Sequence, residues 1–98
     1  MTRQVTLSVN DIPIEIDYFV QGFIDHTVGS MVLSLEHAGE IKTMNVVIEG
    51  ERVILSLNDA EVPINPFVTK IIRNTVTGMV SSLKGVGEIN KINISVRR

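Results

Sequence analysis

The sequence predicts an α+β fold in which two β-β-α-β units form one domain around a pseudo-twofold axis. Residues 5–48 and 53–96 align without a gap at a spacing of 48 residues, and 19 of the 44 aligned positions are identical. Each copy contains segments of alternating apolar residues and one segment of helical periodicity. A repeat of this length is one supersecondary unit that cannot bury its apolar face alone. We therefore expect a six-stranded, mainly antiparallel sheet with two helices on one face and a shared core.

Each unit begins with a hairpin. Apolar residues alternate over segments 5–9 and 12–16, and again over 53–57 and 62–64. Asn10-Asp11 and Asn58-Asp59 separate these segments. Asn and Asp are favoured in turns because their side chains bond the local backbone and tolerate positive φ, so we interpret both pairs as turns rather than as acid–base or metal sites.

A long amphipathic helix follows in each unit. Its apolar positions correspond one for one between the copies: Phe19, Val20, Phe23, Ile24, Val28, Met31, Val32 and Leu35 in the first, and Phe67, Val68, Ile71, Ile72, Val76, Met79, Val80 and Leu83 in the second. We assign the three phenylalanines to the core. Asp17 and Asn65 are placed to cap the two helix N-termini, and Pro66 fits the first helical position. Gly39, and Gly85 or Gly87, are placed to end the helices.

The third strand of each unit is predicted over segments 41–48 and 89–96, where apolar residues alternate again. With both helices on one face, the other face of the sheet is uncovered. It carries mainly short uncharged side chains together with Val47 and Ile54, so we expect it either to be solvated or to contact a partner. The pattern leaves the strand order open.

Length and composition bound the class of protein. Ninety-eight residues with 44% hydrophobic content predict a single domain over residues 1–98. No run approaches 18 apolar residues and no secretory segment is evident, so we expect a soluble, cytoplasmic protein without a membrane association. The absence of cysteine excludes disulfides, thiolate catalysis and cysteine-ligated metals.

The net charge of −2 conceals an asymmetry between the copies. Residues 1–52 contain three basic and eight acidic side chains, whereas residues 53–98 contain six and three. Equivalent positions have changed sign, as at Asp25 and Arg73, and Gly22 is replaced by Lys70. We expect either that Asp25 and Arg73 approach one another across the helices or that these are drifted surface positions. The oppositely charged halves would also suit head-to-tail contact between protomers, and salt would weaken such a contact.

Both helices contain small residues where helix propensity disfavours them, including Gly22, Gly29 and Gly78. An interior glycine costs about 1 kcal/mol relative to alanine. We expect a backbone to approach closely there, from the sister helix or a second protomer, unless these are tolerated surface positions. The outward face of the first helix carries Leu33 and few charges, which favours burial against a partner.

No residue pattern predicts a catalytic, cofactor or metal site. His26 and His37 do not recur in the second copy, and on one helix they would lie about 16 Å apart, too far to share a metal. The Gly85-Val86-Gly87 segment is placed at a helix C-terminus, where the dipole repels phosphate. The sequence thus gives no support for an enzyme, without excluding one.

We therefore expect a non-enzymatic interaction or assembly module that forms a homo-oligomer or binds a protein partner. The candidate interaction residues are Gly22, Asp25, Gly29, Leu33, Val47, Ile54, Lys70, Arg73 and Gly78. The alternative is a small-ligand binding domain, catalytic or not, with its site between the repeats. Nucleic-acid binding by the basic second copy is disfavoured by the acidic total and the scarcity of aromatic residues.

Overall fold

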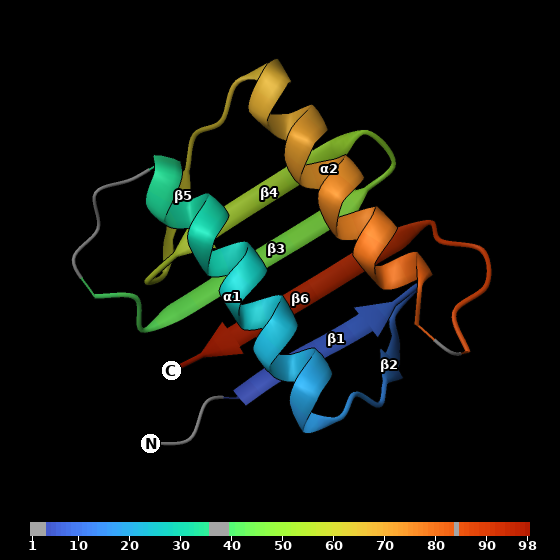
Figure 1. Ribbon diagram of the computed structural model, residues 1–98. Coiled ribbons are helices and arrows are strands. Elements are labelled where there is room, and N and C mark those ends of the chain that lie inside the picture. The colour runs from blue at the N-terminus through green and yellow to red at the C-terminus, as the bar shows by residue number, and fades with distance from the viewer. Residues whose placement is uncertain (1–3, 36–39, 84) are drawn as a thin grey trace.

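Eight elements follow one another in a computed structural model that describes residues 4–35, 40–83 and 85–98 (Figure 1). They are β1 (Gln4–Val9), β2 (Ile12–Ile14), α1 (Tyr18–Leu35), β3 (Thr43–Glu49), β4 (Arg52–Leu57), β5 (Ala60–Val62), α2 (Pro66–Ser81) and β6 (Lys91–Arg97). Every element of the second unit begins 48 residues after its counterpart in the first unit. The β-β-α-β order therefore occurs twice, in the register of the sequence repeat.

The six strands form one sheet in the order β2-β1-β6-β3-β4-β5, and all neighbouring strands are antiparallel. This confirms the predicted fold class and supplies the strand order. The units interleave in the sheet, because β1 pairs with β6 of the second unit and β3 pairs with β4 and β6. Two strands of the same unit, β1 and β3, are thus not neighbours, and each unit completes the sheet of the other.

The pseudo-twofold axis passes through the centre of the sheet. Val46 on β3 lies directly opposite Ile94 on β6, and these two residues are equivalents in the repeat, since 46 + 48 = 94. Both side chains are buried. The two central strands therefore meet at the point where the two units are related to one another.

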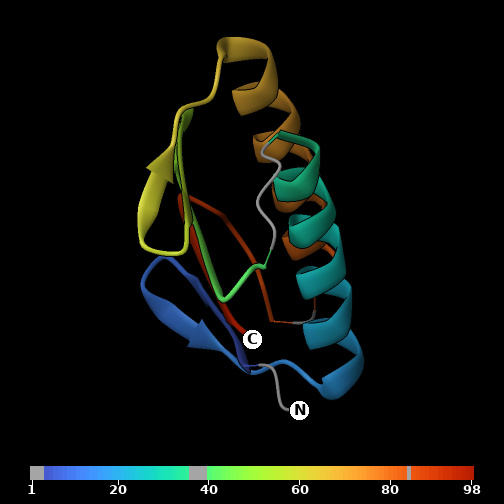
Figure 2. The same cartoon turned by 90° about the vertical axis from the view of Figure 1, so that its left-hand side faces the viewer.

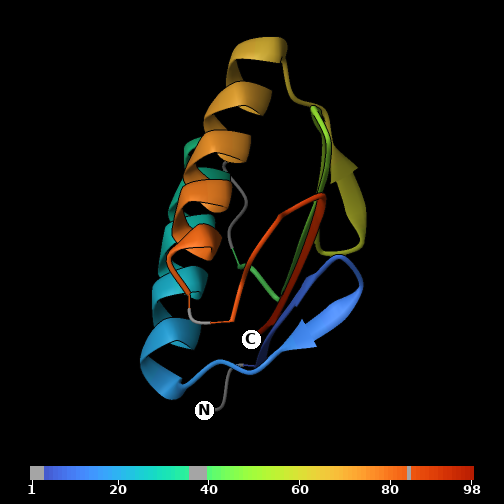
Figure 3. The same ribbon diagram turned by 90° about the vertical axis from the view of Figure 1, so that its right-hand side faces the viewer.

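Both helices cover the same face of the sheet. Figure 1 shows α1 and α2 side by side and running in opposite directions, and Figures 2 and 3 show the opposite face uncovered, with β2 and β5 on that side. The core lies between the layers. It is formed by alternate strand residues and by one stripe on each helix, made of Ile24, Val28 and Val32 on α1 and Ile72, Val76 and Val80 on α2. Neither helix is long and apolar enough to cross a membrane within the described residues.

The predicted helix starts are confirmed. The backbone N–H of Val20 donates to Asp17 Oδ1 at 2.8 Å, and that of Val68 donates to Asn65 Oδ1 at 2.8 Å. Pro66 occupies the first turn of α2, where its missing N–H leaves no bond unmade. Regular helix ends at Ser81, ahead of the predicted stop at Gly85, which has a φ of +82°. The other predicted stop, Gly39, is outside the described residues.

The predicted turns are confirmed by backbone geometry. Asn10 and Asp11 have φ values of +54° and +65°, and Asn58 and Asp59 have +49° and +67°. Positive φ at both central residues is typical of the two-residue turn whose twist matches that of a hairpin. The turn residues are therefore used for their conformation.

The side chains of the two turn asparagines also join distant parts of the chain. Asn10 Oδ1 accepts from the N–H groups of Asn90 and Lys91 at 2.8 and 2.9 Å, and its Nδ2 donates to the Glu88 carbonyl at 2.8 Å. Each of these bonds connects the first hairpin to the segment entering β6. The turn interpretation is correct but incomplete, because the same residue holds the other unit in register.

Candidate interaction surface

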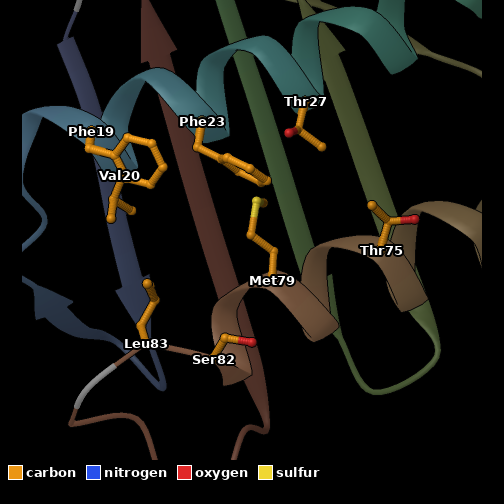
Figure 4. A pocket seen from close by; sticks show the side chains of 8 residues that line it. All are labelled: Phe19, Val20, Phe23, Thr27, Thr75, Met79, Ser82 and Leu83. Carbon is orange, nitrogen blue, oxygen red and sulfur yellow. The ribbon is translucent and has the colours of Figure 1, made fainter.

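An apolar groove lies between the N-terminal half of α1 and the C-terminal end of α2. It encloses about 460 Å³ and is lined by Phe19, Val20, Phe23, Thr27, Thr75, Met79, Ser82 and Leu83. In Figure 4, Met79 extends from α2 toward Phe23 on α1. A flexible thioether beside an aromatic ring makes an adaptable, favourable contact. The groove thus offers soft apolar walls and hydroxyl groups at its margins.

The aromatic residues of this region are exposed. The exposed fractions are 75% for Phe19, 52% for Phe23 and 68% for Phe67, and the rings of Phe19 and Phe23 lie 6.2 Å apart between centroids. The assignment of these three residues to the core is therefore wrong. In α1 the stripe against the sheet runs through Ile24 and Val28, and an α-helix turns about 100° per residue, which directs the phenylalanines outward.

The outward side of α1 carries very little charge. Between Tyr18 and Leu35 the only acidic or basic residues are Asp25 and His26, and Asp25 is buried. Leu33, on the outward side, is 46% exposed. A helix that is apolar on nearly all sides is typical of one covered on all sides. The sparse charge noted in the sequence therefore corresponds to an exposed apolar surface.

The repeat produces a second, related apolar region. The equivalents of Phe19 and Phe23 are Phe67 and Ile71 on α2, and Ile71 is 42% exposed. Leu35, at the end of α1, is the equivalent of Leu83 and is 38% exposed. We use the term apolar helix surface for the exposed large side chains on the outer side of both helices: Phe19, Phe23, Leu33, Leu35, Phe67 and Ile71. Phe19 and Phe23 lie in the first turns of α1, and Phe67 and Ile71 lie in the first turns of α2. The two groups therefore lie toward opposite ends of the antiparallel helix pair (Figure 1).

Four candidate interaction residues lie at or beside this surface. Gly22 lines a shallow pocket with Phe19, Phe23 and His26, while Leu33 belongs to the apolar helix surface itself. Lys70 is exposed on α2. Gly78 is also exposed, and a Cβ added there would meet no atom within 4 Å, so nothing within the described chain requires glycine at that position.

Two further candidates, Asp25 and Gly29, are buried, and both lie against Arg98, which directly follows β6. Arg98 Nε donates to Asp25 Oδ1 at 3.0 Å, and Arg98 Nη2 lies 2.9 Å from the same oxygen. A Cβ at Gly29 would lie 2.7 Å from Arg98 Nη2. Gly29 therefore makes room for the guanidinium. The sequence did not indicate Arg98 as the partner, because residue 98 lies beyond the repeat.

The expected approach of Asp25 to Arg73 is not found. Arg73 instead lies near Glu51, with 3.7 Å between Arg73 Nη1 and Glu51 Oε1. The sign change between the copies has a different explanation. Each helix position is matched to a charge in the segment following the central strand beside it, Arg98 after β6 and Glu51 after β3. Complementarity exists within each half of the domain rather than between the helices.

The remaining candidates, Val47 and Ile54, lie on the uncovered face of the sheet. They are direct partners across β3 and β4, and both are half-buried. A cross-strand pair of β-branched residues stabilises a sheet by mutual packing. Their apolar character is thus accounted for by strand pairing.

Chemistry-bearing side chains are not gathered in the described part of the chain. No group of three or more His, Asp or Glu residues there is placed to hold a metal ion. His26 is exposed on α1, and His37 is outside the described residues. The feature that the geometry brings together is the apolar helix surface.

Comparison of the chain with protein-family models, with curated proteins and with solved structures finds no match, so the function is argued from this geometry.

Proposed function

We propose that the protein is a self-associating module that forms a twofold homodimer through the apolar helix surface. The observation that carries the proposal is the outward exposure of Phe19, Phe23 and Phe67 on a helix layer with few charges. Monomeric proteins rarely expose large contiguous apolar patches, and such patches typically mark interaction sites. Aromatic residues are also enriched in the centres of protein interfaces.

A second copy of the chain is the occupant that this surface suits. A twofold interface uses the same patch on both subunits, so the patch must be complementary to itself. An apolar surface meets that condition, since it contains no charges that repel their own copies. Lys70 and Arg73 are on α2, whereas α1 contains no lysine or arginine. The dimer axis is therefore expected to pass near α1, with Phe19 and Phe23 at the centre.

The helix layer is large enough for a stable interface. The domain measures 35 × 35 × 18 Å along its principal axes, and the helices form one of the two broad faces (Figure 2). A standard interface buries about 800 Å² on each partner. Such an area fits within this face and leaves the uncovered side of the sheet free.

The proposal is tested by measuring the mass of the protein in solution by sedimentation velocity at low and high salt. We expect about twice the chain mass of 10.8 kDa at both salt concentrations, because burial of apolar surface is not screened by ions. Dissociation at high salt would instead support the head-to-tail contact between oppositely charged halves. A monomer at every concentration would overturn self-association.

The repeat supplies a matched pair of variants for this test. Phe19→Glu and Phe67→Glu place the same charge at equivalent, similarly exposed positions on α1 and α2. Phe19→Glu should dissociate the dimer, because it desolvates two carboxylates at the centre of the interface. Phe67→Glu should weaken it less. Equal effects would place the dimer axis between the helices instead of near α1.

A further inference from the structure

The two ends of the helix layer contain equivalent positions with opposite chemistry. At one end the side chain of Arg98 lies between α1 and the sheet, joined to Asp25 and adjacent to Gly29. At the other end Arg73 is the equivalent of Asp25 in the repeat. Gly50 is the structural equivalent of Arg98, because the Arg98 N–H donates to the Lys42 carbonyl, the Gly50 N–H donates to the Asn90 carbonyl, and Lys42 and Asn90 are themselves equivalents. The first end pairs a cation from the chain with a buried carboxylate. The second end carries the cation on the helix instead.

Because Gly50 has no side chain, a cavity of about 260 Å³ exists where Arg98 lies at the other end. Its lining combines one guanidinium with uncharged polar groups and two apolar side chains: Arg73, Asn74, Thr77, Asn90, Ile48 and Ile89, together with Gly50. Thr77 is the equivalent of Gly29, so a hydroxyl also borders the cavity. This combination of a few polar groups with apolar walls is typical of small-molecule sites.

The charge of Arg73 is only weakly compensated by the protein. Its side chain is 26% exposed, and the nearest carboxylate, Glu51, is 94% exposed and lies 3.7 Å away. That separation is too long for a hydrogen bond. An arginine presents a planar fork of donors that suits a carboxylate or a phosphate. The cavity thus offers a cation whose ion-pair partner is a solvated side chain outside hydrogen-bond distance.

We infer that this cavity is a binding site for a small oxyanion, with the anionic group on Arg73 and a short apolar body against Ile48 and Ile89. The bound anion takes the place that the Arg98 guanidinium has at the other end, with the charges exchanged. At about 260 Å³ the cavity is below the ~300–1,000 Å³ usual for drug-sized ligands, which favours a small carboxylic acid over a nucleotide.

The inference is tested by titrating ¹⁵N-labelled protein with butyrate and, separately, with inorganic phosphate at constant ionic strength. Saturable shifts are expected for the backbone amides of Gly50, Thr77 and Asn90. Tighter binding of butyrate identifies a carboxylate with an apolar body as the ligand class, whereas tighter binding of phosphate identifies a phosphate group. Absence of saturable shifts with either probe would overturn the inference.

Three variants distinguish a specific binding site at Arg73 from general attraction of anions to positive charge. Arg73→Gln should weaken binding by about tenfold or more, since a hydrogen bond to a charged group contributes at least that much. Arg73→Lys keeps the charge without the planar fork and should give an intermediate affinity. The matched control Arg52→Gln changes net charge equally at an exposed strand position outside the cavity. Equal weakening in Arg73→Gln and Arg52→Gln would overturn the site.

Discussion

Asn10 and Asn58 make the same three side-chain hydrogen bonds in opposite halves of the sheet. Asn58 Oδ1 accepts from the N–H groups of Lys42 and Thr43 at 2.8 and 3.1 Å, and its Nδ2 donates to the Glu40 carbonyl at 3.0 Å. These partners lie 48 residues before the partners of Asn10. The sequence separations nevertheless differ greatly, at 78–81 residues for Asn10 and 15–18 for Asn58.

Replacing either asparagine by glycine retains the positive-φ turn and removes the three bonds. Asn10→Gly and Asn58→Gly should each lower the free energy of unfolding by about 1–2 kcal/mol, because the groups are near the surface and water replaces part of the bonding. Urea unfolding followed by far-ultraviolet circular dichroism measures this change. A difference of more than about 1 kcal/mol between the variants would contradict the equivalence of the two clamps.

The kinetics of the same two variants should differ. Contacts between residues close in sequence form at a lower entropic cost of loop closure, so the bonds of Asn58 are expected earlier in folding. Asn58→Gly should therefore slow folding, and Asn10→Gly should mainly accelerate unfolding. Stopped-flow measurements over a range of urea concentrations separate the two rates. The opposite assignment would show that the β1–β6 pairing precedes the central hairpin.

The Asp25–Arg98 pair is expected to contribute strongly to stability. Asp25 is almost fully buried and Arg98 is about one third exposed. Removing one partner of a buried pair costs ~3–5 kcal/mol, and the partial exposure of Arg98 reduces this to about 2–3 kcal/mol for Arg98→Met. A double-mutant cycle with Asp25→Asn should give a coupling energy above about 1 kcal/mol. Additive effects would show that the two side chains act independently.

The two helix glycines should respond differently to alanine. Gly78→Ala adds a methyl group in open space and should stabilise α2 by up to about 1 kcal/mol through helix propensity. Gly29→Ala forces the Arg98 guanidinium to move and should gain less or destabilise. In an Arg98→Met background Gly29→Ala should regain the full benefit. Equal gains from both alanine variants in the wild-type background would contradict the close approach of Arg98.

Because the aromatic side chains point outward, replacing one by alanine is expected to change the stability of the monomer very little. Phe19→Ala should change the free energy of unfolding of the monomer by no more than about 0.5 kcal/mol, as for surface positions generally. Ile24→Ala, at a fully buried position, should cost about 2–5 kcal/mol. Thermal unfolding at a dilution that dissociates any oligomer measures both. A large loss of unfolding free energy in Phe19→Ala would show that this side chain packs in the core.

Local features of this fold are readable from the sequence because they depend on neighbouring residues. The caps at Asp17 and Asn65 and the turns at Asn10 and Asn58 follow from the chemistry of single side chains and are found as predicted. The repeat then fixes the second unit once the first is assigned. The same reasoning places both helices on one sheet face.

The strand order and the orientation of α1 depend on information that periodicity does not contain. An alternating segment shows which residues share a face, but not which strand lies beside it, so periodicity does not predict the exchange of β3 and β6 between the units. In α1 apolar residues occupy nearly all sides of the helix. Periodicity alone therefore does not show whether the side with Ile24 or the side with Phe19 packs against the sheet. The sequence indicates the candidate surface through Leu33, through the lack of charge around it and through the small residues Gly22 and Gly78, whereas the exposed phenylalanines are not predicted.

In the interleaved sheet, the turn that joins β3 to β4 and the neighbouring ends of β6 and β1 are at symmetry-related positions. Glu49 is paired with Arg52 across the Gly50-Glu51 turn, and Arg97 is paired with Gln4 at the symmetry-related place in the sheet. A two-residue link from Arg97 to Gln4 therefore reproduces a turn that the protein already contains. A circular permutant that starts at Arg52 and ends at Glu49 would carry the units in reverse order and form the same ladder of strands. Its folding pathway would then begin at what is now the β1–β6 pair.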